Sequence, residues 1–134
     1  MSIKKKLPQT EVEQQVEWTP KIGPKEEVIE LRATLEKIKD REGMIGYILR
    51  TSTSAFVDLK DPSKIIDYAA LSAEAIEFGE KLSNAFELGK TNSIILEGKE
   101  VKILSLIIRE QRLSVFMEKN VDHNSVYKDL TQST

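Results

Sequence analysis

Few residues in this chain carry side chains that commonly do chemistry. The sequence has 134 residues, with no cysteine and one histidine, so disulfides, thiolate metal sites and a cysteine nucleophile are excluded. The histidine, His123, stands between Asp122 and Asn124, and without a second histidine or a cysteine it cannot build a typical zinc site. Nothing in the sequence marks it as the base that a serine nucleophile would need. We expect His123 to be a surface residue at the start of a helix.

Carboxylates and arginines offer two further kinds of chemistry. Glu74, Glu77 and Glu80 could form paired carboxylates for acid and base catalysis, but they lie on the polar side of a predicted helix, which favours a solvated face. Three arginines near predicted strand ends or turns could touch the phosphates of a nucleotide held by a partner protein, or could be ordinary surface residues. They are Arg50, Arg109 and Arg112. Because the six glycines are scattered, no glycine-rich phosphate loop is present, and we expect no catalytic site, cofactor or metal.

Composition limits the class of protein and of partner. Twenty basic and twenty-two acidic residues leave no overall field that would attract nucleic acid. The longest apolar run is far shorter than the ~20 residues that span a bilayer, and the N-terminus lacks the apolar core of a signal peptide. We therefore expect a cytoplasmic protein that neither binds nucleic acid nor is integral to a membrane.

The segment from Ser63 to Gly89 is the element around which the chain is organised. On a helical wheel its apolar and small residues cover an arc of about 180°, whereas a helix that faces only its own core needs roughly 100°. Such a helix either has a second surface to bury against another chain or is sunk deep in one domain. Small residues in the middle of the arc would let another backbone approach closely. The wide face contains Tyr68, Leu71, Ser72, Ala75, Phe78, Gly79, Leu82 and Phe86.

The other elements follow from periodicity and turn signals. A first helix with a narrow apolar stripe is predicted to start after Gly23-Pro24, to run to about Arg41 and to stop at Gly43. Strands are predicted over 44–50, 54–59, 93–97, 100–109 and 112–118, with tight turns at Gly98-Lys99 and Glu110-Gln111. A short last helix follows, capped by Asp122 or Asn124.

The strand over residues 100–109 is apolar on both sides in its second half. A strand of this kind is covered on both faces. The sequence therefore predicts an α+β fold, in which a five-stranded, mainly antiparallel sheet has the long helix on one face and two helices on the other.

The chain is long enough for one domain. We expect a flexible tail over residues 1–23, one domain over 24–130 and a polar end over 131–134. Trp18, the only tryptophan, is either an anchor for a partner or a clasp on its own domain. Deletion of residues 1–22 is expected to leave the fold intact.

The order of these elements resembles the roadblock-type dynein light chain family. The likeness is carried by Leu71-Ser72-Ala73-Glu74-Ala75-Ile76, by Leu82, and by the run from Ser93 to Gly98 that leads into the last two strands. It covers about residues 25–130, and Gly46 matches the glycine of the family's first strand. The chain departs from the pattern at Thr51-Ser52-Thr53, where an Asp-Gly turn is common. The family includes prokaryotic regulators of Ras-like GTPases and scaffold subunits of lysosomal signalling complexes.

The resemblance implies a mode of pairing, because roadblock domains lay their long second helices side by side and join their third strands. It implies a non-catalytic homodimer, or a pair with a related roadblock subunit, that regulates or scaffolds a small Ras-like GTPase or a signalling or motor assembly. The alternative is a small-molecule sensor with a pocket between sheet and helix. The interface residues carried over by position are Tyr68, Leu71, Ser72, Ala75, Phe78, Gly79, Leu82, Ser93, Ile94, Ile95 and Leu96.

Overall fold

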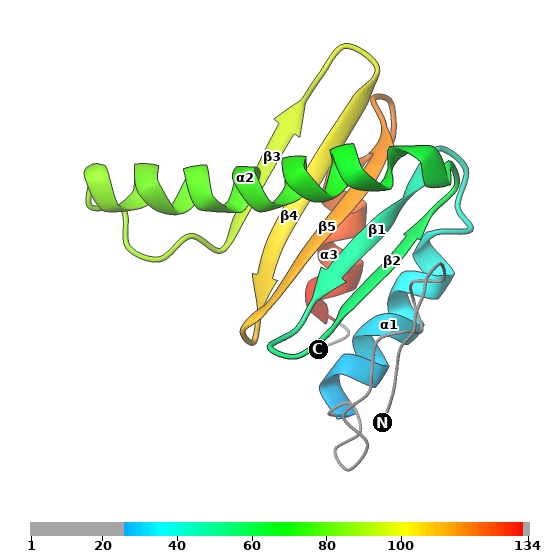
Figure 1. The fold of residues 1–134 in the computed structure, drawn as a ribbon, viewed down its shortest axis with the longest axis horizontal. Helices are drawn as coiled ribbons and strands as arrows, with labels where there is room; N and C mark the ends of the chain where they lie inside the picture. The colour runs from blue at the N-terminus through cyan, green and yellow to red at the C-terminus, as the bar shows by residue number, and fades with distance from the viewer. Residues whose placement is uncertain (1–25, 133–134) are drawn as a thin grey trace, which may run out of the picture.

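The computed structural model of the chain describes residues 26–132. In chain order its elements are α1 (Glu26–Ile38), β1 (Met44–Arg50), β2 (Ala55–Leu59), a short 3-10 turn (Pro62–Lys64), α2 (Ile65–Ala85), β3 (Ser93–Glu97), β4 (Val101–Ile108), β5 (Gln111–Glu118) and α3 (His123–Gln132). They form three layers, with α2 across one face of the sheet and α1 and α3 on the other (Figure 1).

The five strands form one sheet in the order β2-β1-β5-β4-β3, and every neighbouring pair is antiparallel. The predicted α+β fold, with its two faces covered as expected, is therefore confirmed. The outer strands are β2 and β3. Figure 1 shows that the C-terminal end of α2 extends past β3, beyond the edge of the sheet.

Two apolar cores lie on the two faces of the sheet. The larger one packs α1 and α3 against the strands, and Leu35, Leu49 and Leu113 are fully buried within it. The smaller one lies under α2 and is centred on Phe116, whose ring stacks on that of Tyr68 with 4.5 Å between centroids. Aromatic stacking adds about 0.5–1.5 kcal/mol to the free energy gained by burial alone. This stack therefore fixes the first half of α2 on the sheet.

Strand β1 carries an irregularity at which a glycine is required. The pairing register of β1 with β5 shifts between Met44 and Gly46, and Gly46 has a φ of 151°. A Cβ atom at this position would lie 2.2 Å from the carbonyl oxygen of Asp58 and 2.7 Å from the Cα of Leu59. The close approach of β1 and β2 therefore depends on the missing side chain.

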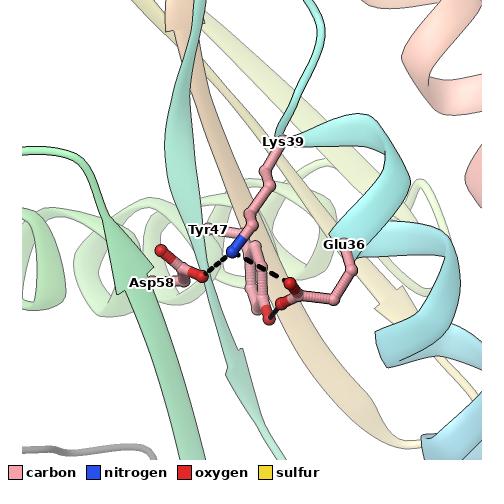
Figure 2. Close-up of polar contacts among 4 residues, drawn as sticks. All are labelled: Glu36, Lys39, Tyr47 and Asp58. Atoms are coloured by element: carbon pink, nitrogen blue, oxygen red, sulfur yellow. Dashed lines mark hydrogen bonds and ion pairs between the residues drawn. The ribbon is translucent and has the colours of Figure 1, made fainter.

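A polar network joins the end of α1 to the sheet (Figure 2). The Lys39 ammonium contacts the carboxylates of Glu36, at 2.9 Å, and Asp58 of β2. The buried Tyr47 hydroxyl donates a hydrogen bond of 2.8 Å to the Glu36 carboxylate. Burial and this acceptor raise the pKa of Tyr47, and its two carboxylate partners raise the pKa of Lys39. The network therefore holds α1 on two neighbouring strands.

Glu36 gives this network a pH dependence. Partial burial works against ionisation, but hydrogen bonds from Lys39 and Tyr47 lower the pKa of Glu36 below its ordinary value of 4.5. Because the folded-state pKa is the lower one, the stabilising effect of the carboxylate is present above pH 4.5 and is lost as the pH falls through the folded-state pKa. We expect Glu36→Gln to flatten the fall in stability in that range, as measured by urea unfolding at a series of pH values. The same change at the exposed Glu30 is the control, and equal flattening in both variants would contradict this role.

The helix ends differ from the prediction. The first helix ends at Ile38 and not near Arg41, so Gly43 lies in the turn before β1. The long helix ends at Ala85 and not at Gly89, because the chain reverses earlier. Leu88 N–H donates to the Ser83 carbonyl and Glu87 N–H to the Asn84 carbonyl, which is the Schellman pattern. The residue in the left-handed conformation is Glu87, with a φ of 56°.

A non-glycine residue in the left-handed conformation costs about 1 kcal/mol. We therefore expect Glu87→Gly to raise the free energy of unfolding by about 0.5–1 kcal/mol, as measured by chemical denaturation. Glu77→Gly, in the middle of α2, is the matched control and should lower it by a similar amount. A loss of stability in Glu87→Gly would contradict the Schellman assignment.

Two other boundaries are corrected. The turn between β4 and β5 is centred on Arg109 and Glu110, with φ values of 48° and 74°, and not on Glu110-Gln111. A positive φ at both central residues is typical of a type I′ turn. Gln111 already belongs to β5. The last helix continues to Gln132, so residues 131 and 132 are not part of a separate polar end. The Asp122 carboxylate accepts from Asn124 N–H at the start of the last helix, as expected. The Asp61 carboxylate accepts from Ser63 N–H and caps the 3-10 turn before α2.

Candidate interaction surface

The wide face of the long helix is divided into two parts by the structure. Its small residues Ser72, Ala75 and Gly79 are buried against the chain's own sheet. A Cβ atom on Gly79 would lie 3.3 Å from Thr91 and 3.5 Å from Ile94. The side chains that approach α2 at Gly79 therefore belong to the chain's own Thr91 and Ile94, so the close approach that the small residues allow does not by itself require a second chain.

Hydroxyl groups hold the second half of α2 at the start of β3. The Thr91 hydroxyl donates to the Gly79 carbonyl at 2.9 Å and lies 2.7 Å from the Ser83 hydroxyl. The Gly79 carbonyl oxygen has a second lone pair that can accept this bond besides the helical one. The Thr91 side chain reaches it because the start of β3 lies close to α2 here. The glycine and the two hydroxyls explain how α2 runs across the edge strand.

The large residues of the wide face remain exposed. Leu71, Phe78 and Leu82 have exposed fractions of 41%, 56% and 39%, and Phe86 beyond the helix end has 70%. On the wheel Leu71, Phe78 and Leu82 lie about 100° from the buried side of α2. We call these three residues together with Phe86 the apolar flank. Exposed apolar groups gathered along one line of a helix are typical of an interaction site.

Strand β3 is the second part of this surface. It pairs only with β4 among the described strands, so the backbone groups of its outer edge have no strand partner. Ile94 faces α2, Ile95 packs into the core on the opposite face, and Leu96 is 39% exposed. An open edge strand is a template for pairing with another strand. The predicted interface residues of β3, including Ser93, therefore lie at an edge that another chain can reach.

The opposite flank of α2 is polar and is bound to the ends of β1 and β5. Glu80 contacts Arg112 at 3.4 Å. Arg50 is half-buried and donates to the Ala69 carbonyl at 3.0 Å and to the Ser72 hydroxyl at 3.3 Å. Burial and the neighbouring charge of Arg112 lower the pKa of Arg50. These two arginines hold α2 on the sheet, a role that the sequence pattern did not reveal.

A cleft of about 900 Å³ lies between this polar flank and the β4–β5 turn. Its lining includes Glu80, Glu87, Arg109 and Arg112, and Ile107 is the one large apolar residue that lines it. Sites for small molecules are mostly apolar with a few polar groups. This cleft is instead lined mostly by charged and polar residues, with few apolar ones.

The other residues considered for chemistry are placed by the structure as follows. His123 begins α3, is partly buried, and its Nδ1 lies 2.9 Å from the ammonium of the buried Lys102. Within residues 26–132, no cluster of three or more potential metal ligands occurs. A helix long and apolar enough to cross a membrane is also absent from this part of the chain. Trp18 and the tail lie outside the described residues.

Comparison with known proteins gives structural relatives only. No protein-family model and no curated protein matches the sequence. A Roadblock/LC7 domain from Streptomyces avermitilis has a TM-score of 0.61 at 13% identity, covering 78% of this chain and 88% of that chain. MglB from Myxococcus xanthus has 0.61 at 13%, covering 84% and 87%, and the gliding protein MglB from Thermus thermophilus has 0.62 at 12%, covering 84% and 88%. These matches extend over most of each chain, and they show that this protein has the roadblock fold.

Proposed function

We propose that this chain is a non-catalytic interaction module that pairs through the apolar flank and the outer edge of β3. The observation that carries this proposal is the exposure of Leu71, Phe78 and Leu82 on the helix that crosses an open edge strand. A second copy, or a related roadblock subunit, would cover both features at once. A twofold interface of this kind is self-complementary and closed.

We further propose that the paired form is a platform for a small Ras-like GTPase or for a signalling or motor assembly. The support is the roadblock fold of the chain, and one solved neighbour is described as MglB with a tetrameric arrangement. If the protein regulates GTP hydrolysis, it would act by holding the switch loops of the GTPase in an active arrangement, because the order of those loops sets the rate.

The platform is tested by affinity capture from the native cell, with the wild-type protein and a pairing-deficient variant as baits. We expect small Ras-like GTPases to be enriched on the wild-type bait, and each candidate is then purified and its affinity measured by calorimetry in both nucleotide states. Absence of any GTPase that binds the purified protein would contradict this part of the proposal and leave a scaffold for other subunits.

The second candidate function is a small-molecule sensor, which the cleft beside α2 favours by its place between helix and sheet. Its charged lining argues against an apolar ligand. A ligand that binds only the folded state raises the melting temperature. A rise with one nucleotide or metabolite among a panel would support the sensor, and a flat response would leave the platform in place.

A further inference from the structure

A pair of opposite charges borders the apolar flank on the side away from the sheet. Glu74 and Lys81 are both exposed on α2 and are separated by seven residues, which is close to two full helical turns. They therefore lie on nearly the same line of the helix, and this line runs beside that of Leu71 and Phe78. A partner that covers the apolar flank would have Glu74 and Lys81 at the rim of the contact.

These two charges have no partner within the described part of the chain. Seven residues of helix correspond to about 10 Å along the axis, so Glu74 and Lys81 cannot form an ion pair with each other in one copy. Neither forms an ion pair with another residue of the range 26–132, although Glu80 on the opposite flank does so with Arg112. These two charges, which we call the charge row, are therefore available to a partner outside this part of the chain.

We propose that Glu74 and Lys81 set the register of a homodimer, with Glu74 of each copy paired to Lys81 of the other. This inference rests on the proposed pairing of two copies. A twofold axis that joins two β3 edges places the two α2 helices antiparallel on the same face of the joined sheet. When the twofold axis passes midway between Glu74 and Lys81 along α2, Glu74 of each copy lies opposite Lys81 of the other, which makes two pairs.

The midpoint of this row falls beside Phe78, the most exposed large residue within the α2 part of the apolar flank. The register that pairs the charges thus also brings the two Phe78 rings together at the axis. A shift of the axis by about one turn would instead place Lys81 opposite Lys81 in one direction. In the other direction it would place Glu74 opposite Glu74, with Asp67 opposite Lys81, so only the midway register has no like-charge pair in the row and two opposite-charge pairs. Like charges across an interface suppress the wrong arrangement, so the charge row selects one register and favours a second copy as the partner.

Charge reversal tests this register. Glu74→Lys and Lys81→Glu each place two like-charge pairs in the dimer, and we expect each to weaken self-association about tenfold or more at low salt. The double variant Glu74→Lys/Lys81→Glu restores both pairs and should return to within about threefold of the wild-type dissociation constant. An equimolar mixture of the two single variants should form the heterodimer in preference to either homodimer, because only the mixed pair has opposite charges at both places.

Two controls separate this effect from general electrostatics. Glu30→Lys makes the same change in net charge as Glu74→Lys, on an exposed residue of α1 on the face of the sheet opposite α2, and should leave self-association unchanged. The difference between wild type and the single variants should shrink at 1 M salt, where the Debye length is about 3 Å.

The outcomes distinguish this inference from the proposal beneath it. A wild-type protein that stays monomeric overturns the pairing itself, and the register with it. A wild-type dimer that is insensitive to both Glu74→Lys and Lys81→Glu overturns the register and leaves the pairing in place. Weakening by Asp67→Lys but not by Glu74→Lys also overturns it, because Lys81 would then pair one heptad further along.

Discussion

Phe78→Glu is expected to weaken self-association about 1,000-fold while the protein remains folded. Phe78 is 56% exposed in the single chain, so the substitution removes little of the chain's own packing. In a twofold pair it acts twice, and each aromatic anchor lost from the centre of an interface costs roughly 2 kcal/mol or more. Two such losses correspond to about three powers of ten in the dissociation constant. Sedimentation velocity over a dilution series measures this constant, and circular dichroism checks the fold.

Ile66→Glu is the matched control for Phe78→Glu. Ile66 is also on α2 and is 82% exposed, but it lies about 120° around the helix from Phe78. It should leave the dissociation constant within about twofold of wild type, since a change outside an interface does not affect pairing. Equal weakening by both substitutions would mean that general exposure of apolar side chains, and not the apolar flank, drives association.

The choice of Phe78 follows from the division of the wide helix face. A glutamate at Ala75 or an arginine at Gly79 would meet the chain's own strands, because both positions are buried. Burial of an unpaired charge is costly, so those variants would be expected to lose the fold before they report on pairing. Substitutions on the apolar flank avoid this ambiguity.

Gly46→Ala is expected to have the largest effect on stability, a loss of about 3–4 kcal/mol in the free energy of unfolding. The added Cβ would lie 2.2 Å from the Asp58 carbonyl oxygen, so β1 and β2 would have to separate. Overpacking of this kind costs typically 1–3 kcal/mol. A side chain at a φ of 151° adds backbone strain of order 1–3 kcal/mol. Urea denaturation of the purified variant measures the total.

Gly89→Ala isolates the contribution of the clash. Gly89 also has a positive φ, of 89°, but a Cβ there meets nothing within 4 Å. We expect Gly89→Ala to lower the free energy of unfolding by only about 1 kcal/mol, from backbone strain alone. A Gly46→Ala variant no less stable than Gly89→Ala would show that the contact between β1 and β2 is not as close as the structure has it.

The sheet could be predicted from the sequence because its physical signals are local. Strand formers with period 2, separated by turn residues, placed every strand within one residue of its observed bounds, as with Ser93–Glu97. The helix ends were harder to predict. Glycine is the usual residue in the left-handed position at a helix end, so the pattern pointed to Gly89, whereas the backbone reverses at Glu87.

The candidate site could be predicted only in part. The wheel measures the width of the apolar face of α2 but does not say what covers each portion. Gly79 has the same signature whether β3 of its own chain or the helix of a second copy approaches it. Only the tertiary structure separates the buried small residues from exposed Phe78 and Leu82. Buried Lys102 was missed for a similar reason. In the sequence it occupies a polar position of an alternating strand, which predicts exposure, and only the tertiary structure places His123 of α3 beside its ammonium.

The mass of the wild-type protein in solution tests the central claim most directly. Light scattering from the full chain over a range of concentrations down to the low micromolar should give a stable mass near twice 15.2 kDa. This result would agree with a second copy covering the apolar flank and the edge of β3. A mass of 15.2 kDa at every concentration would contradict the homodimer and turn the search toward a related roadblock subunit as the partner.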